Sequence, residues 1–257
     1  MKIFVCIKQV PDTETKIKLS PDGLSIDPNG VKWVMNPYDE FAVEEAIKIK
    51  EKNAGAQIFA VTFGPKKRTA DCLRTALAMG ADEGIIIDGP EYSEPSLAAK
   101  ALAKLIQSEG GAELVLTGKQ SIDDNAFSVS QMIAEHLNIP HATAVSKCSI
   151  EGGKANVTSD LDGGAKAQLE LTLPCLIAAN KGLNMPRYAS LPGIMKAKKK
   201  LLKEVDLASL GIDIQNQTKV LSMELPADKP PVKMLTGDSQ AQATALVHAL
   251  RDEAKVL

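Results

Sequence analysis

Short apolar segments alternate with longer, more polar segments over the first half of the chain. Four predicted strands cover residues 2–8, 57–62, 84–88 and 114–117, and the predicted helices between and after them open at Asn36 and cover 68–79, 94–107 and 125–136. Short apolar runs are typical of buried parallel strands, and helices at this spacing provide right-handed crossovers between them. The alternation therefore predicts an α/β fold with a doubly wound, mostly parallel sheet, a Rossmann-like nucleotide-binding domain.

The second half of the chain departs from this alternation. Three segments look like antiparallel strands joined by Gly-Gly turns: 145–150, 155–160 and 167–173. These segments predict an antiparallel extension, after which residues 175–179 return to the main sheet. A smaller hairpin is predicted within residues 16–34, around the turn Pro21-Asp22-Gly23, as an insertion after the first strand.

Prolines interrupt the C-terminal part of the chain, at Pro226, Pro230 and Pro231, before a predicted amphipathic helix over 240–256. We therefore divide the chain into a domain at 1–204 and a C-terminal arm at 205–257. The arm is too irregular to form a core of its own, so we expect it to lie against this domain or against a partner.

The segment from Leu114 to His136 is the first candidate for a site. An apolar strand ends at Gly118, a polar loop follows, and an Asp/Asn cluster at 123–125 is a candidate N-cap for the next helix. Ligands of parallel sheets lie beyond the carboxyl ends of the strands, where a helix N-terminus favours phosphate. The alternative is an ordinary strand-to-helix connection. The loop is neither a Walker A motif nor Gly-x-Gly-x-x-Gly.

Composition and spacing exclude several other functions. The formal net charge of −2 gives no case for nucleic-acid or membrane binding. The four cysteines form no Cys-x-x-Cys pair and the three histidines form no ligand pattern, so we expect buried, reduced thiols and no metal. Asp123 and Asp124 are adjacent and point different ways, which favours loop hydrogen bonds over acid–base catalysis. The N-terminus is unlike a signal peptide, and we expect a cytoplasmic protein.

A basic run is the strongest local charge feature of the chain. It comprises Lys196, Lys198, Lys199, Lys200 and Lys203. It follows a Pro/Gly loop that contains Leu191, and a helix with a dense lysine face is predicted over 194–202. An apolar residue rimmed by lysines has the anatomy of a small transient interface for an acidic partner. The alternative is a solvated helix face with Leu191 packed into the domain.

Several blocks of the sequence resemble one family. Residues 187–200, RYASLPGIMKAKKK, are similar to the signature of electron-transfer flavoprotein β subunits, and further similar blocks lie at 5–10, 36–40, 74–82 and 118–124. The resemblance implies a heterodimer in which the α subunit holds most of the redox FAD. The β subunit supports that FAD, usually binds a structural AMP, and catalyses no bond chemistry alone. Flavin dehydrogenases such as acyl-CoA dehydrogenases would donate electrons, a membrane quinone oxidoreductase would accept them, and the C-terminal arm would wrap onto the α subunit.

The resemblance also implies residue roles, position by position. The AMP site would comprise Cys6, Asn36, Pro37, Tyr38, Asp39, Phe63, Gly118, Gln120, Ser121, Ile122, Asp123, Asp124, Asn125, Ala126, Phe127, Ser128, Val129, Ser130, Gln131 and Met132. A recognition loop within 184–203 would dock dehydrogenases through Arg187, Tyr188, Leu191, Pro192, Ile194, Met195, Lys196 and Lys199, with Leu191 as its anchor. Lys196 and Lys199 match positions methylated in some relatives, and Asp160 falls where relatives place a glutamate near the flavin.

The family has a second branch, which bifurcates electrons and carries a second FAD where other members bind AMP. Asp124 stands where that branch has a glycine, and a side chain there should crowd the additional diphosphate. This difference favours the AMP branch. Asn125, Phe127, Val129 and Ser130 depart from the usual loop, and Ser128 or Ser130 would have to replace the missing threonine hydroxyl. The alternatives are a bifurcating β subunit and a homodimeric nucleotide-binding module of the stress-protein kind.

Overall fold

The computed structural model describes residues 1–212 and 217–257. Its main feature is a nine-stranded sheet in the order β11-β5-β4-β1-β6-β10-β7-β8-β9. The strands from β11 to β7 pair in parallel, whereas β8 and β9 continue the sheet antiparallel to their neighbours. Their bounds are β1 Lys2–Cys6, β4 Gln57–Gly64, β5 Glu83–Asp88, β6 Leu114–Gly118, β7 His141–Glu151, β8 Lys154–Asp160, β9 Lys166–Thr172, β10 Cys175–Ala179 and β11 Leu202–Asp206.

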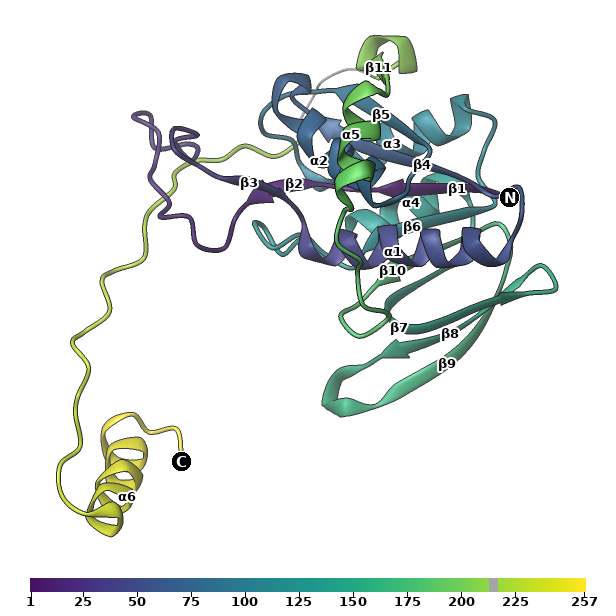
Figure 1. Ribbon diagram of the computed structural model, residues 1–257. Helices are drawn as coiled ribbons and strands as arrows, with labels where there is room; N and C mark the ends of the chain where they lie inside the picture. Colours follow the sequence, from purple (N-terminus) through teal and green to yellow (C-terminus); the bar gives the residue numbers. More distant parts are fainter. Residues whose placement is uncertain (213–216) are drawn as a thin grey trace.

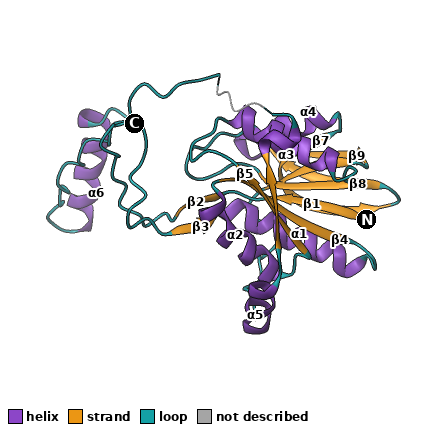
Figure 2. Ribbon diagram, turned by 90° about the horizontal axis from the view of Figure 1, so that it is seen from above, coloured by secondary structure: helices purple, strands orange, loops and turns teal. Residues whose placement is uncertain are grey.

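Helices cover both faces of the sheet, as Figure 2 shows from above. One face carries α1 (Pro37–Lys52) and α2 (Lys66–Met79), and the other carries α3 (Pro95–Ser108) and α4 (Val129–Leu137). The side chains of β1 alternate between the two cores: Ile3 and Val5 face the first, Phe4 and Cys6 the second. The mostly parallel sheet and its antiparallel extension confirm the predicted fold.

The insertion after β1 differs from the predicted hairpin. β2 (Gln9–Pro11) pairs with β3 (Trp33–Met35), and between them only a single bridge joins Leu19 to Ile26. The predicted hairpin around Pro21-Asp22-Gly23 is therefore present, but its pairing is shorter than the segment 16–34. Pro21 and Pro28 have no N–H to donate to a ladder, which limits pairing in this segment.

The helix predicted over 194–202 lies earlier in the chain. α5 spans Leu191–Lys199, and residues from Leu202 form β11, which extends the sheet beside β5. The division that we placed at residue 204 thus falls inside a strand, and the buried side chains of Leu207 and Ile212 continue the second core beyond it. A short 3₁₀ turn at Leu207–Leu210 carries this extension.

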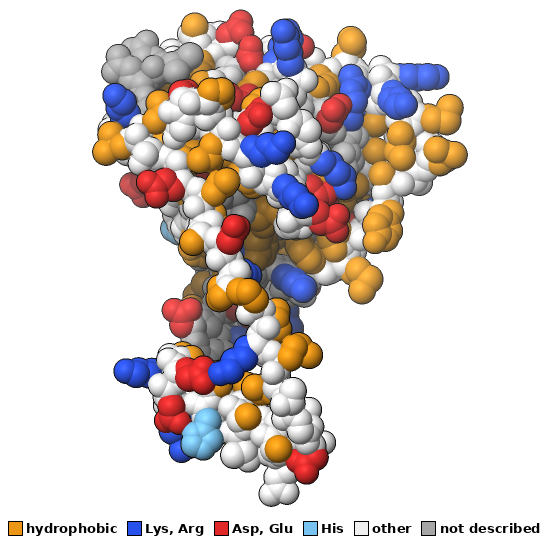
Figure 3. All heavy atoms as spheres, turned by 90° about the vertical axis from the view of Figure 1, so that its left-hand side faces the viewer, with side chains coloured by type: hydrophobic (Ala, Val, Ile, Leu, Met, Phe, Trp, Pro, Cys, Tyr) orange, Lys and Arg blue, Asp and Glu red, His pale blue; other side chains and the backbone are white. Residues whose placement is uncertain are grey.

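The chain from residue 217 onward leaves the sheet as an extended arm (Figure 1). The first described residues of the arm are bound to Glu94, which precedes α3. The carboxylate of Glu94 accepts hydrogen bonds from the N–H groups of Gln217 and Thr218, each at 2.9 Å. It ends in α6 (Ser239–His248) and one π-helical turn, neither of which has a buried residue. Figure 3 shows hydrophobic side chains spread over the arm, and Leu221, Leu225, Val232 and Met234 are exposed. In the part of the chain described here, no helix could span a bilayer.

Candidate functional site

A pocket of about 730 Å³, partly open to solvent, lies at the carboxyl ends of β1 and β6. The strands β4 and β5 follow β1 on one side of it and β6 lies on the other, so the pocket occupies the switch point of the sheet. Its wall combines strand ends, the starts of α1 and α4, and one side of α3: Cys6, Ile7, Lys8, Asn36, Asp39, Phe63, Ser93, Pro95, Ala98, Leu102, Thr117, Gly118, Lys119, Gln120, Ser121, Asp124, Ala126, Val129, Ser130 and Ile133.

Asp39 fastens the start of α1 to both strands that border the pocket. Its Oδ2 accepts the backbone N–H of Lys8 at 2.7 Å and its Oδ1 accepts that of Gly118 at 2.9 Å. Burial raises the pKa of Asp39 to about 7, although these two N–H donors oppose the shift. Burial, with the nearby Asp39 charge second, also raises the pKa of the Cys6 thiol to about 12, so this pocket thiol is uncharged near neutral pH.

Asn36 immediately precedes α1 but does not cap it. Its side chain makes no hydrogen bond to the first turn of α1. Instead, its amide NH₂ donates to the carbonyl oxygen of Gln120 at 2.9 Å, and its carbonyl oxygen accepts the N–H of Ile122 at 3.2 Å. The expected N-cap is wrong because this side chain connects α1 to the loop after β6.

We call residues 119–128 the nucleotide loop. The predicted capping role of its Asp/Asn cluster is wrong, because α4 starts only at Val129 and neither Asp123 nor Asp124 reaches its first turn. Asp124 instead accepts from the Ser121 hydroxyl at 2.5 Å and from the Ala126 N–H at 2.9 Å, while Asn125 has a left-handed φ of 52°. The cluster folds the loop on itself rather than onto the helix.

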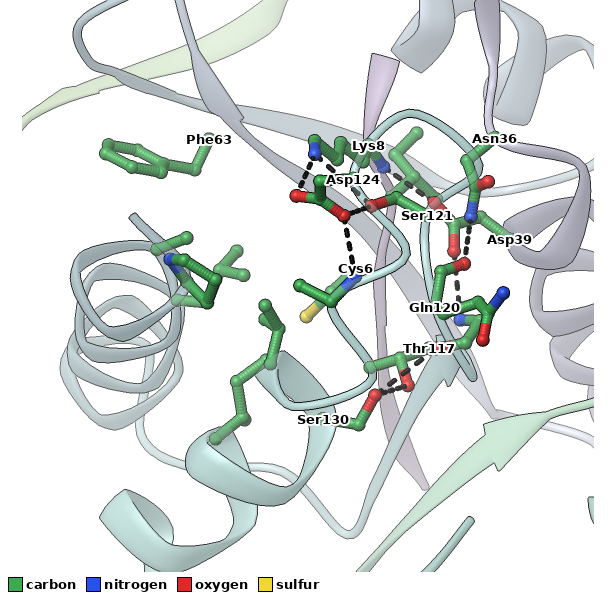
Figure 4. Close-up of a pocket in the computed structure, with 18 of the residues that line it drawn as sticks. Cys6, Lys8, Asn36, Asp39, Phe63, Thr117, Gln120, Ser121, Asp124 and Ser130 are labelled. Atoms are coloured by element: carbon green, nitrogen blue, oxygen red, sulfur yellow. Dashed lines mark hydrogen bonds and ion pairs between the residues drawn. The ribbon is translucent and has the colours of Figure 1, made fainter. Parts of the chain in front are cut away.

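Lys8, which follows β1, binds side chains of the nucleotide loop. Its ammonium group donates to Asp123 at 2.9 Å, to Asp124 at 3.0 Å and to the Ser121 hydroxyl at 3.2 Å. Figure 4 shows Lys8, Asp124 and Ser121 together on one side of the pocket. Burial opposes the positive charge of Lys8, but the two aspartates outweigh it and raise the pKa of Lys8.

The hydroxyl group expected for phosphate binding is engaged elsewhere. The Ser130 hydroxyl lies 2.8 Å from that of Thr117 and donates to the carbonyl oxygen of Gly118 at 3.2 Å. Ser128 does not line the pocket. The donors that α4 offers at this end are therefore the backbone N–H groups of its first turn, which lack intrahelical partners.

The structure brings part of the predicted AMP set together around this pocket. Eleven of those residues line it: Cys6, Asn36, Asp39, Phe63, Gly118, Gln120, Ser121, Asp124, Ala126, Val129 and Ser130. The other nine do not line it: Pro37, Tyr38, Ile122, Asp123, Asn125, Phe127, Ser128, Gln131 and Met132.

Sequence reasoning missed several lining residues. Lys8, Thr117 and Lys119 adjoin the ends of β1 and β6, so a strict use of the strand-end rule could have found them. No comparable signal marks Ser93, Pro95, Ala98 and Leu102, because α3 reaches the pocket only through packing.

The predicted recognition segment forms an exposed apolar surface around α5. Leu191 is 72% exposed, Tyr188 is fully exposed, and Met195 and Ile194 are also exposed. The interpretation in which Leu191 packs into the domain is therefore wrong. We call these four residues the α5 surface.

α5 is capped at its start and attached to the domain at its end. At its start, the Ser190 side chain accepts the N–H of Gly193 at 3.1 Å. At its end, Arg74 donates to the carbonyl oxygen of Ala197 at 2.8 Å, and Lys200 donates to the carbonyl oxygens of Ala81 and Asp82 at 2.9 and 2.8 Å. Lys200 is thus internal, whereas the exposed ammonium groups of Lys196, Lys198 and Lys199 have no ion pair among the described residues.

Arg187 attaches the segment before α5 to α1. Its guanidinium makes two hydrogen bonds to the buried carboxylate of Glu44, at 2.8 and 2.9 Å, and one to Glu51 at 2.8 Å. These bonds, chiefly the pair to Glu44, raise the pKa of Arg187 above its ordinary value. Arg187 therefore contributes to the recognition segment at least as an internal anchor.

Replacing Arg187 by alanine is expected to lower the free energy of unfolding by about 2 kcal/mol, because the buried carboxylate of Glu44 loses its partner. This loss is smaller than that for breaking a fully buried ion pair, because Arg187 is partly exposed to solvent. Urea unfolding measures the change. Glu51→Ala, which breaks only the exposed pair, should cost much less than Arg187→Ala. Equal losses in the two variants would contradict the assigned role of Glu44.

Asp160 lies outside the pocket, on β8. Its carboxylate accepts hydrogen bonds from Lys166, Ser146 and Asn180 at 2.7, 2.8 and 3.0 Å. These bonds, that of Lys166 first, lower the pKa of Asp160 to about 2. Among the described residues, no cluster of His, Cys, Asp and Glu could hold a metal ion.

Comparison with known proteins agrees with this architecture. The model of the electron transfer flavoprotein domain family matches residues 23–210. Electron transfer flavoprotein subunit beta of Homo sapiens is 42% identical over 233 residues, covering 89% of this chain and 90% of the relative. The mitochondrial subunit beta of Oryza sativa subsp. japonica and the subunit beta of Bacillus subtilis are each 40% identical over the full length of both chains. The chain therefore belongs to the electron transfer flavoprotein family, as a β subunit and an electron-carrier component.

Proposed function

We propose that this chain pairs with an electron-transfer flavoprotein α subunit, binds one AMP, and belongs to the non-bifurcating branch. Electrons would come from flavin dehydrogenases such as acyl-CoA dehydrogenases, as in fatty acid β-oxidation, and pass to a membrane quinone oxidoreductase. The FAD supplies the redox chemistry and is held mainly by the α subunit. The chain has a positional role: it supports that FAD and presents the α5 surface. The cytoplasmic location stays a prediction.

The pocket at the switch point carries the proposal of AMP binding. It lies beyond the carboxyl ends of parallel strands, where α/β sheets bind their ligands. Phe63, Pro95 and Leu102 supply an apolar wall suited to a base, and the first turn of α4 supplies N–H groups suited to a phosphate. Asp124 lines the same pocket, which supports the AMP branch because a second FAD would need room for its diphosphate there.

Nucleotide content tests this proposal directly. The chain is produced together with its α subunit, the complex is denatured, and the released nucleotides are quantified by chromatography. We expect one FAD and one AMP per heterodimer. Two FAD would place the chain in the bifurcating branch, and one FAD without AMP would exclude the nucleotide role of the pocket. A stable flavin-free homodimer would instead favour a stress-protein-like module.

Leu191→Ala is expected to lower the rate of electron transfer from a dehydrogenase at limiting concentration by about tenfold, because an exposed apolar anchor dominates small interfaces. The FAD content should not change, since Leu191 lies on the exposed α5 surface and the FAD is held mainly by the α subunit. The matched control is Leu201→Ala, which removes a leucine that is still more exposed and lies outside the α5 surface. Equal rates for the two variants would exclude Leu191 as the anchor.

We also propose that the C-terminal arm, which we placed at 205–257, packs on the α subunit. The exposed apolar side chains of its described residues and the absence of buried residues in α6 support this assignment. Such a surface gains stability only when another element covers it.

A further inference from the structure

Lys8 is placed between two parts of the nucleotide pocket. Its backbone N–H binds Asp39 at the start of α1, and its ammonium group binds Asp123, Asp124 and Ser121 of the nucleotide loop. No other lysine or arginine pairs with these two aspartates among the described residues. Lys119, which also lines the pocket, instead has its ammonium group 5.2 Å from the centre of the Tyr38 ring.

The charges around the nucleotide loop create a problem for an anionic ligand. Asp124 lines the pocket and Asp123 is adjacent to it, so the loop carries two negative charges where a phosphate would have to approach. The single charge of Lys8 neutralises one of them. Both aspartates are partly exposed, so solvent and salt weaken these interactions without removing them.

The same contacts determine the shape of the loop. Asp124 accepts from Ser121 and Ala126 within the loop, while Lys8 reaches it from the segment between β1 and β2. The ammonium group thus holds both carboxylates on its own side of the loop, and Figure 4 shows its contact with Asp124. Without Lys8, the two adjacent carboxylates would repel each other and the loop would lose its attachment to the segment between β1 and β2.

We propose that Lys8 is a positioning residue of the nucleotide site, which holds Asp123 and Asp124 in place and neutralises one of their two charges so that a nucleoside monophosphate can bind. This inference rests on the proposed AMP site. It adds a residue outside the predicted AMP set and assigns its side chain an electrostatic role. A purely structural lysine would affect folding but would not make AMP affinity depend on the loop's charge.

The test is a titration of the αβ complex with AMP at low and high salt, after the bound AMP has been removed by dialysis. Lys8→Met is expected to weaken AMP binding by about tenfold at low salt and by less at high salt, because salt screens the uncompensated aspartates. Lys8→Arg should restore most of the affinity. Lys16→Met, which removes an exposed lysine of the insertion, is the matched control and should bind AMP as the wild type does.

Two further variants separate charge from structure. Lys8→Met/Asp123→Asn/Asp124→Asn removes the repulsion and should recover most of the affinity lost in Lys8→Met. Asp124→Asn alone keeps an acceptor oxygen for Ala126 and removes one negative charge, so it should bind AMP several-fold more tightly at low salt. This variant tests the inference even where Lys8→Met does not fold.

The outcomes are distinguishable. Wild-type affinity in Lys8→Met overturns the role of Lys8 while leaving the AMP site intact. A loss that neither depends on salt nor is recovered in the triple variant shows a structural lysine only, and also overturns the inference. Failure of the wild-type complex to bind AMP contradicts the proposed site itself, and the inference with it.

Discussion

Through Asp39, the free energy of unfolding of the wild-type protein is expected to fall by about 4 kcal/mol between about pH 4 and pH 8, and Asp39→Asn is expected to abolish this fall. Burial raises the pKa of Asp39 from 3.8 to about 7, so the folded protein holds this proton more tightly than the unfolded chain does. The contribution of the protonated group is complete below about pH 4 and is lost as the pH rises through 7. Asparagine does not titrate, so its variant should lack this slope.

Urea unfolding of the wild type and of Asp39→Asn at several pH values measures the difference between their free energies of unfolding. Groups that titrate elsewhere in the chain contribute equally to both proteins and cancel in this difference. Asparagine offers one acceptor oxygen to two N–H donors, those of Lys8 and Gly118, so the variant should also be less stable at low pH by about 1–3 kcal/mol. Parallel pH profiles for the two proteins would show that Asp39 titrates in its ordinary range.

Gly118→Ala is expected to destabilise the protein by about 3 kcal/mol, because the end of β6 lies against the start of α1 with no space for a side chain. A Cβ atom at residue 118 would lie 2.3 Å from Oδ1 of Asp39 and 2.8 Å from the carbonyl carbon of Tyr38. Backbone cannot yield as a flexible side chain can, so α1 would have to move away from β6. The αβ complex of this variant should also retain less AMP, since Gly118 and Asp39 both line the pocket.

The matched control is Gly111→Ala. Gly111 has a φ of 85° but open space around its Cβ position, so the substitution should cost only about 1 kcal/mol of backbone strain. Thermal or urea unfolding of the two variants separates close packing from general loss of glycine. A cost at Gly118 no larger than that at Gly111 would contradict the close approach of α1 and β6.

The fold follows from local patterns in this chain to an unusual extent. Apolar runs such as Gln57–Gly64 and Leu114–Gly118 end at glycine, so strands and the helices after them could be placed from the residues alone. The misplacements have a common cause. Asn36 and Asp124 have the composition of helix caps, but distant partners, Gln120 and Lys8, determine where their side chains point.

The pocket could be predicted at the ends of β1 and β6, since topology alone places ligands there. Its wall from α3 could not, because Ser93 and Leu102 reach the pocket through tertiary packing that leaves no pattern in the sequence. Similarly, Arg187 was recognisable as part of a recognition segment, but its bond to the buried Glu44 depends on the approach of that segment to α1.

The cap at the start of α5 and the attachment of its end bear on how long the proposed encounter with a dehydrogenase would last. Bonds from Ser190, Arg74 and Lys200 order the backbone of this helix before any partner arrives. Docking on it would then restrict only the rotamers of a few exposed side chains, so little conformational entropy is lost on association. A small apolar face can therefore be selective without binding tightly, which lets each encounter end soon after the electron has moved.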